Sequence, residues 1–371
     1  MLYDEVIQLM RNIQDDFNQF ISIESIGKTH ENRDILMLTI DAGKVDDIAK
    51  FGEPQPKNNS ILLVGAHHSR ELVSVQMPLY AILDLLHGLV HSDQEKTVLL
   101  KKNKYLVIPF INTDGSYTIY EQYMKTGELI LKRKNNDRRF EFEQGLECPL
   151  AEQGVDINRN YGVDFGNDAG PCDESFPGPH PFSEPETKAM RGLLYRLQKE
   201  IKFVYNFHSY GPMFIWPYNG EKTNTLHEEN PDAEMIFNEI WHEAEFPSTT
   251  LSGNAIQTVG YLSNGEANDY IMKEFNIPSV SPELANDDFF SGDFFLPYDF
   301  VTRSVLRDNL PWVLHTFKKL AGEIDIDPLD DATYSVKDNS TISVSLNVKN
   351  IGLQDWNLGD EQFKLAVLDG Q

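Results

Sequence analysis

Residues 61–72 read ILLVGAHHSREL, and this stretch decides how the rest of the chain is organised. Its apolar first half predicts a buried strand that runs into a Gly-Ala step. His68 and Glu71 follow three residues apart, so an imidazole and a carboxylate can turn toward one point just past the strand. Such a pair can bind a divalent metal. On its own the pair is weak evidence, because the same spacing occurs by chance in surface turns.

Further along the chain, more apolar segments end in polar residues that could join this point. Buried strands are predicted over residues 105–112, 201–208 and 278–284. They finish at or next to Asn112, His208 and Glu283. In open α/β sheets, ligands bind outside the carboxyl ends of the strands. Together with His68, these positions predict a metal-dependent active site at one edge of a sheet.

Helical patterns alternate with the predicted strands. Helices are expected over residues 3–20, 73–91, 231–245, 268–275 and 299–320, and another strand over 34–41. Residues 112–115, NTDG, have the composition of a turn. Residues 183–186, SEPE, match a capping box that opens a helix to about residue 199. The order of elements predicts an α/β fold with a mixed, mostly parallel central sheet flanked by helices.

Two segments depart from this regular pattern. Residues 131–182 lose periodicity, and irregular stretches of that length inside a compact domain are usually functional. After residue 322 an acidic linker leads to STISVSLNVKN at 340–350, which alternates as a half-buried strand. With residues 363–368 it predicts a small C-terminal β-rich appendage, which is either the start of a partial β-sandwich or a small sheet docked on the main domain. We therefore divide the chain into a main domain, 1–322, and a segment at 323–371.

Composition excludes several classes of partner. The 371 residues carry a net charge of -26, which repels nucleic acid and anionic membrane surfaces. No apolar run approaches the roughly 20 residues that span a bilayer, so no membrane span is expected. Cys148 and Cys172 can form a disulfide or remain two free thiols, and their spacing alone does not decide. Asn58 and Asn339 begin glycosylation acceptor patterns, which hint at secretion.

His68, Glu71 and His208 form a set of two histidines and one glutamate that leaves an open position on zinc, as in hydrolytic sites. The chain resembles the zinc carboxypeptidases of the pancreatic A and B type over nearly all of residues 1–320. The resemblance rests on motifs in the same order, namely HSRE at 68–71, NTDG at 112–115, RKN at 133–135, DINRN at 156–160, SEPET at 183–187, FHSY at 207–210 and SPEL at 281–284.

The resemblance implies a role for each residue of the site. One Zn²⁺ ion would be bound by His68, Glu71 and His208. Glu283 would be the general base that activates the attacking water, and Arg133 would stabilise the oxyanion. The substrate-binding residues implied are Arg70, Asn158, Arg159, Ser209, Tyr210, Tyr261 and Asn268.

Within this set, Asn158, Arg159 and Tyr261 would hold the free C-terminal carboxylate of a peptide, for which a planar guanidinium is well suited. Asn268 occupies the pocket-floor position, where it is neither apolar nor acidic, so a polar or mixed side-chain preference is expected. Asp156 is interpreted as a structural hydrogen-bond acceptor for the NRN loop.

The expected activity is zinc-dependent hydrolysis of the C-terminal peptide bond of peptides or proteins, releasing a single amino acid. Two alternatives are the same chemistry on cell-wall or γ-linked peptides, and a non-catalytic module that binds peptide C-termini. The resemblance also favours a Cys148–Cys172 disulfide, a monomer, and an extracellular or secretory/vesicular compartment.

Overall fold

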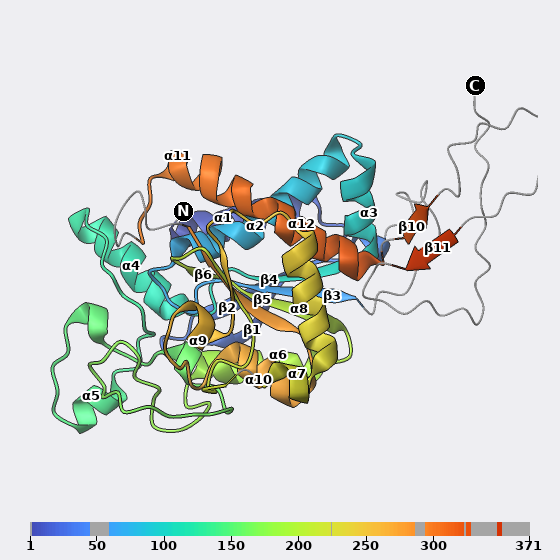
Figure 1. Ribbon diagram of the computed structural model, residues 1–371. Helices are drawn as coiled ribbons and strands as arrows, with labels where there is room; N and C mark the ends of the chain where they lie inside the picture. The colour runs from blue at the N-terminus through green and yellow to red at the C-terminus, as the bar shows by residue number, and fades with distance from the viewer. Residues whose placement is uncertain are drawn as a thin grey trace, which may run out of the picture.

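The computed structural model describes residues 2–44, 59–223, 225–285 and 294–322, together with two short strands at 324–327 and 347–350. Its main sheet has nine strands in the order β1-β2-β4-β3-β5-β9-β7-β8, and β6 pairs with β9 (Figure 1). The strands are β1 (Ile21–Lys28), β2 (Asp34–Ile40), β3 (Ser60–Val64), β4 (Lys104–Ile108), β5 (Ile201–Asn206), β6 (His208–Ser209), β7 (Met213–Ile215), β8 (Leu251–Gly253) and β9 (Ser279–Leu284).

The centre of this sheet is parallel. Strand β3 pairs in parallel with both β4 and β5, and β5 pairs in parallel with β9. Strands β1 and β2 join the edge in antiparallel orientation, and β7 lies antiparallel to β9. The predicted mixed, mostly parallel sheet is confirmed. Parallel pairing places the carboxyl ends of β3, β5 and β9 at one edge.

Helices cover both faces of the sheet (Figure 1). They are α1 (Tyr3–Asp16), α2 (Leu72–Val90), α3 (Gln94–Lys102), α4 (Thr113–Thr126), α5 (Arg139–Glu143), α6 (Pro185–Leu197), α7 (Leu226–Glu229), α8 (Pro231–Glu243), α9 (Ala255–Thr258), α10 (Ala267–Phe275), α11 (Tyr298–Phe300) and α12 (Arg307–Ala321).

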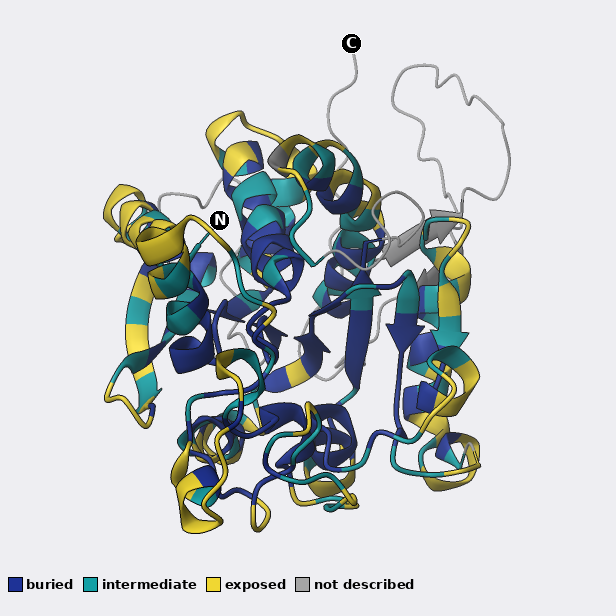
Figure 2. Cartoon of the chain, turned by 90° about the vertical axis from the view of Figure 1, so that its left-hand side faces the viewer, coloured by how far each residue is buried: buried dark blue, intermediate teal, exposed yellow. Residues whose placement is uncertain are grey.

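Alternation along β3 explains the two apolar layers. Ile61 and Leu63 join the cluster that contains α1, α2, α3 and α12, whereas Leu62 and Val64 join the cluster that contains α6 and α10. Successive side chains of a strand point to opposite faces, so a strand covered on both sides is apolar throughout. Figure 2 shows the inner strands as buried and the outer helix faces as exposed.

Helix α2 is apolar enough to resemble a membrane span, with a mean hydropathy of 1.4 over an 18-residue window. No apolar run of this length was expected from the sequence. However, 67% of the apolar window is buried inside the protein, so the helix is most simply a core element. Its Ala81, Ile82 and Leu85 have no exposed surface.

Several predicted elements differ from the structure. The turn predicted at 112–115 is wrong, because Asn112 caps α4 and accepts a hydrogen bond from the Gly115 N–H at 3.1 Å. The capping box predicted at Ser183 is also wrong. Glu184 is the N-cap, and the Ser183 hydroxyl donates to Oε1 of Glu184 at 2.7 Å. Strands β1, β7 and β8 and helices α3, α4, α5, α7 and α9 were not predicted, and the closing helix contains a π-helical segment, Val301–Leu306.

The predicted C-terminal appendage is only partly described. Residues 347–350 form β11 (Asn347–Asn350), which pairs antiparallel with β10 (Ile324–Asp327). The rest of the predicted strand at 340–350, the strand at 363–368, and the acceptor residues Asn58 and Asn339 lie outside the described residues.

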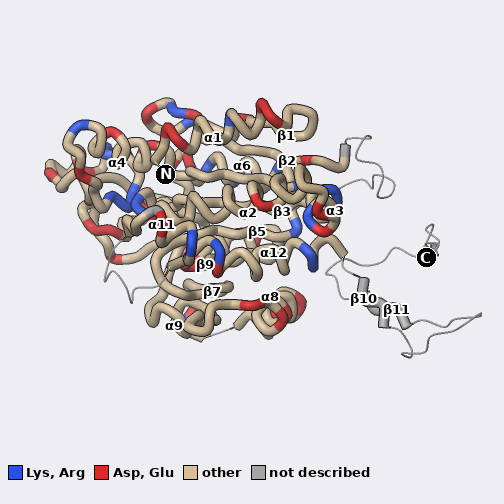
Figure 3. The backbone as a smooth tube through the Cα atoms, turned by 90° about the horizontal axis from the view of Figure 1, so that it is seen from above, with Lys and Arg blue, Asp and Glu red and all other residues tan. Residues whose placement is uncertain are grey.

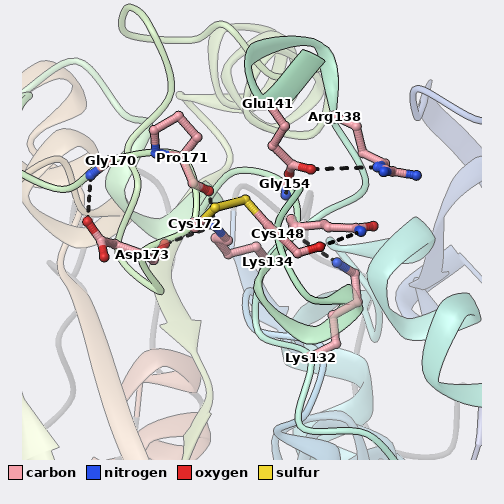
Figure 4. Close-up of a disulfide and its surroundings, with 11 residues drawn as sticks. Lys132, Lys134, Arg138, Glu141, Cys148, Gly154, Gly170, Pro171, Cys172 and Asp173 are labelled. Atoms are coloured by element: carbon pink, nitrogen blue, oxygen red, sulfur yellow. Dashed lines mark hydrogen bonds and ion pairs between the residues drawn. A yellow bond between two sulfur atoms is a disulfide. The ribbon is translucent and has the colours of Figure 1, made fainter. Parts of the chain in front are cut away.

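Residues 131–182 are mostly irregular, as predicted, and are held by contacts other than a sheet (Figure 4). The Cys148–Cys172 disulfide is present and confirms that expectation. The buried amino group of Lys132 donates to the Gln153 carbonyl at 2.9 Å. That of Lys134 donates to the Pro171 carbonyl at 2.7 Å. These bonds replace regular backbone pairing in a segment that carries several predicted site residues.

Removing the disulfide should destabilise this segment. The bridge joins residues 24 apart, and closing a loop of that size stabilises a fold by about 3 kcal/mol. We expect the double variant Cys148→Ser/Cys172→Ser to lose about 3 kcal/mol of unfolding free energy, measured by urea titration without reductant. Wild-type protein in reductant should move in the same direction. An unchanged midpoint in both would show that the bridge adds nothing.

Stability should also depend on pH through Lys132. Burial, with nearby Lys134, lowers the pKa of Lys132 from 10.5 to about 7. Between these values the unfolded chain binds the proton and the folded chain does not, so stability rises with pH, by at most about 1.4 kcal/mol per pH unit for one group. Urea midpoints at pH 7, 8 and 9 should rise less in Lys132→Met than in wild type. Lys125→Met, at an exposed position on α4, should keep the wild-type slope, and equal slopes in all three proteins would contradict the assignment.

Candidate metal centre

The loop after β3 is fixed by hydrogen bonds to two other segments. The Ser69 N–H donates to the Arg133 carbonyl at 3.0 Å. The side-chain amide of Asn112 donates to the carbonyls of His67 and Arg133, at 3.2 Å each. Asn112 was expected near the site, and the structure shows it as a buried link between the loop after β3 and the RKN segment.

His68, Glu71 and His208 converge on one point, although His208 lies 137 residues from Glu71 in the chain. The Nδ1 atom of His68 is 2.7 Å from Oε1 of Glu71, and Nδ1 of His208 is 2.9 Å from Oε2. The two Nδ1 atoms are 3.2 Å apart. All three side chains are buried. Among the described residues, they form one of two groups of potential metal ligands.

The separation of the two Nδ1 atoms fits zinc. Bonds of about 2.0–2.1 Å in a tetrahedral site place ligand atoms about 3.3 Å apart, close to the separation of the two Nδ1 atoms. Burial lowers the pKa of His208, which favours the neutral imidazole that metals bind. Burial alone would raise the pKa of Glu71, but His68 and His208 hold it far below its usual range. Two imidazoles and one carboxylate are a typical donor set of catalytic zinc sites.

A second layer of charge surrounds these residues. Oδ1 of Asp156 lies 3.2 Å from Nε2 of His68, and its Oδ2 accepts a hydrogen bond from Nε of Arg133 at 3.0 Å. Burial raises the pKa of Asp156, but Arg133 and His68 outweigh it and hold the pKa well below the ordinary value. Asp156 also accepts from the Asn158 N–H at 3.0 Å, as expected for a loop acceptor. Its contact with His68 was not predicted, because no sequence signal links residues so far apart.

Glu283 lies on β9 directly beside His208 on β6. Burial and the negative charge of Glu71 raise the pKa of Glu283 well above its ordinary value, although Arg133 opposes them. Glu283 also lines a cavity of about 220 Å³ with Met213, Phe246 and Trp312. A carboxyl group with a raised pKa beside a metal centre can both accept and return a proton.

Asn158 and Arg159 lie next to the three converging residues. The Asn158 amide nitrogen is 3.4 Å from Nε2 of His208, and Arg159 donates from Nη1 to the Asn158 carbonyl at 2.7 Å. Arg159 is 3.7 Å from Glu266, a partner that the sequence did not indicate. Tyr261, by contrast, is 57% exposed. The structure thus places two of the expected carboxylate-binding residues inside the site and the third at the surface.

The remaining predicted residues have other partners. Arg70 makes two bonds to the Glu174 carboxylate, at 2.6 and 3.0 Å. The Ser209 N–H donates to Glu71 at 3.3 Å, and the Tyr210 ring packs on Phe294 at 4.9 Å between centroids. The side chain of Asn268 is fully buried, where it bonds to Asn206, Ser279 and Ser281.

Several known proteins are similar to this chain in sequence. Residues 6–306 match the family described as zinc carboxypeptidase. Carboxypeptidase A6 of Homo sapiens is 26% identical over 219 residues, covering 58% of this chain and 44% of that protein. Carboxypeptidase B of Astacus astacus is 26% identical over 220 residues, covering 58% and 63%. A protein of Talaromyces stipitatus named inactive metallocarboxypeptidase ecm14 is 29% identical over 225 residues, covering 58% and 34%.

Solved structures show the same fold. Bovine thrombin-activatable fibrinolysis inhibitor, in complex with tick carboxypeptidase inhibitor, has a TM-score of 0.64 at 22% identity and covers 86% of this chain and 97% of that one. Carboxypeptidase A of Helicoverpa armigera also has a TM-score of 0.64, at 24% identity, covering 86% and 73%. The match covers between 34% and 63% of the length of the three relatives named above.

The converging residues generate a metal-binding prediction. Glu71→Gln should lower zinc affinity at least about 100-fold. Even the loss of a residue that only hydrogen-bonds to a metal ligand lowers metal affinity by about 10–100-fold. Competition with a chromogenic chelator would measure this affinity. His91→Ala, which removes an exposed imidazole just after α2, should bind zinc as wild type does. Undiminished affinity in Glu71→Gln would remove Glu71 from the ligand set.

Proposed function

Because the chain belongs to the zinc carboxypeptidase family, as its motifs predicted, we propose that it hydrolyses the C-terminal peptide bond of peptides or proteins and releases a single amino acid. One observation carries the proposal. Glu71 contacts both His68 and His208, and Glu283 on β9 pairs with His208 on β6. These residues supply the ligands for one catalytic zinc and a base beside it.

Zinc bound there would polarise the scissile carbonyl and make water a better nucleophile. Glu283 removes a proton from the attacking water and passes it to the leaving amine. The raised pKa of Glu283 supports proton removal from the water and proton delivery to the amine, because a strongly acidic carboxyl would be a weak base and would hold the proton too weakly to deliver it.

Arg133 stabilises the negative charge that develops on the carbonyl oxygen. Asp156 fixes the guanidinium through Nε at 3.0 Å, and Nη1 is 3.9 Å from Glu71. A cation held in place before the reaction needs little reorganisation when the charge appears. Asp156 therefore acts as a positioning residue for both Arg133 and His68.

Arg159 and Asn158 bind the free C-terminal carboxylate, and Tyr261 completes the contact from the surface. In the absence of substrate, Glu266 at 3.7 Å offsets part of the charge on Arg159. A substrate carboxylate gives the same guanidinium a planar, bidentate partner, so peptides with a free C-terminus are preferred. Arg70, Ser209 and Tyr210 contact neighbouring parts of the substrate. A polar or mixed side-chain preference follows if Asn268 forms the pocket floor, as the resemblance implies.

A non-catalytic role is the main alternative, since several fungal relatives are named inactive metallocarboxypeptidases. The presence of Glu283 and Arg133 in this chain supports an enzyme, because a module that only binds C-termini needs neither. A γ-linked or cell-wall peptide also ends in a carboxylate, so the residues that bind this group do not favour one class of peptide over the other.

We also propose that the protein acts as a monomer in an extracellular or secretory compartment. The Cys148–Cys172 disulfide supports this location, because disulfides persist mainly in oxidising environments.

The proposed mechanism predicts separate effects on chemistry and on metal binding. Glu283→Gln should lower kcat by about 10²–10⁴-fold, while the protein retains the zinc of the catalytic site. Release of free amino acid from a linear peptide measures kcat, and elemental analysis measures zinc. Glu228→Gln, at an exposed position on α7, is the matched control.

The same peptide with a C-terminal amide should be turned over at least tenfold more slowly in kcat/KM, because it lacks the carboxylate that Arg159 binds. Equal turnover of acid and amide would contradict carboxylate binding. Wild-type protein that holds zinc but releases no amino acid from linear or γ-linked peptides would favour the binding module.

A further inference from the structure

A second group of potential metal ligands lies outside the site described above. His30 follows β1, and Glu184 and Glu186 flank Pro185 at the start of α6. One ligand atom from each lies within 4.8 Å of the others. We propose that His30, Glu184 and Glu186 bind a second divalent cation, separate from the catalytic zinc and independent of the proposed activity.

The two glutamates lack a fixed positive charge. Both are fully buried. Within the part of the chain that the structure describes, the only ion-pair partner of Glu184 is His30, at 2.9 Å, and Glu186 has none. The N-terminus of α6 contributes roughly half an elementary positive charge, which is too little to balance the negative charge of two carboxylates. Buried carboxylates without a partner are costly, so a cation between them would remove a large unfavourable term.

Hydrogen bonding leaves one atom for a ligand. The Asn135 amide donates to Oε2 of Glu184 at 2.7 Å and to Oε2 of Glu186 at 3.2 Å. Ser183 donates to the other oxygen of Glu184 at 2.7 Å. Oε1 of Glu186 is buried and has no hydrogen-bond partner. Native proteins leave few buried polar atoms unsatisfied, and coordination would satisfy this one.

His30 provides both a nitrogen ligand and a route for entry. Its side chain is 23% exposed, whereas the glutamates behind it are sealed from solvent. Oδ2 of Asp137 is 3.6 Å from Nε2 of His30, and Arg139 holds that carboxylate in place at 2.7 Å. An imidazole with carboxylates suits zinc and other first-row divalent ions better than calcium or magnesium.

The position of the cluster indicates a structural role. Asn135 is two residues from Arg133, and Ser183 accepts a hydrogen bond from Asn160, the neighbour of Arg159, at 2.8 Å. A cation here would therefore fasten the two irregular segments that carry these arginines. Because a metal that binds only the folded chain stabilises it, the bound ion should raise the unfolding temperature.

Zinc itself is the probe for this site. We expect wild-type holoenzyme, equilibrated by dialysis against micromolar zinc, to hold two zinc ions per chain by elemental analysis. His30→Ala and Glu186→Gln should each hold one and keep the wild-type kcat. His227→Ala is the matched control, because His227 pairs with a single carboxylate, Glu234, at 2.6 Å on the surface. It should hold two.

Added zinc should also raise the unfolding temperature of wild-type holoenzyme and of His227→Ala, but not that of His30→Ala. Equal zinc content per chain in wild type and in His30→Ala would overturn the proposal, whether or not the catalytic site is filled. The exposed His30 variant decides the question if Glu186→Gln fails to fold. Glu184 and Glu186 could instead share a proton. In that case Glu186→Gln would unfold at a higher temperature than wild type, and wild type would hold only one zinc ion.

Discussion

The contact of Glu71 with both His68 and His208 is the constraint on which the functional part of this structure depends. It exists because β3 and β5 pair in parallel, with Val64 opposite Asn206, so their carboxyl ends meet at one edge of the sheet. The chain reaches that edge twice, 137 residues apart, and supplies a ligand set neither segment could form alone. Apolar packing on both faces of β3 fixes the strand and thereby the start of the loop that carries His68 and Glu71.

Charge is arranged around this contact in layers. Glu71 lies between two imidazoles, Asp156 lies between His68 and Arg133, and Glu266 approaches Arg159. Each of these three buried carboxylates therefore has an imidazole or guanidinium partner, which is the condition under which buried charges are tolerated. Across the described chain Asp and Glu outnumber Lys and Arg, as Figure 3 illustrates, so the basic residues around the metal centre stand out from an acidic protein. In the proposed mechanism, Arg159 binds the peptide carboxylate and Arg133 stabilises the oxyanion.

The sequence predicted the central strands and several of the flanking helices, because apolar runs carry that information, and its motifs singled out the three residues that the structure brings together, His68, Glu71 and His208. It predicted less where one residue type serves two purposes. Asn112 is favoured in turns and at helix N-caps alike, and the structure uses it as a cap. Strands β7 and β8 are three residues long, too short for a period to be visible. The contacts of Asp156 with His68 and of Glu266 with Arg159 span about a hundred residues, and no local pattern encodes them.

An anomalous difference map recorded at the zinc edge from crystals of the wild-type protein tests the central claim most directly. The account predicts a peak bonded to His68, Glu71 and His208, with Glu283 near it but outside bonding distance. A map with no peak between these three side chains, or with zinc bound through Glu283 in place of Glu71, would contradict it.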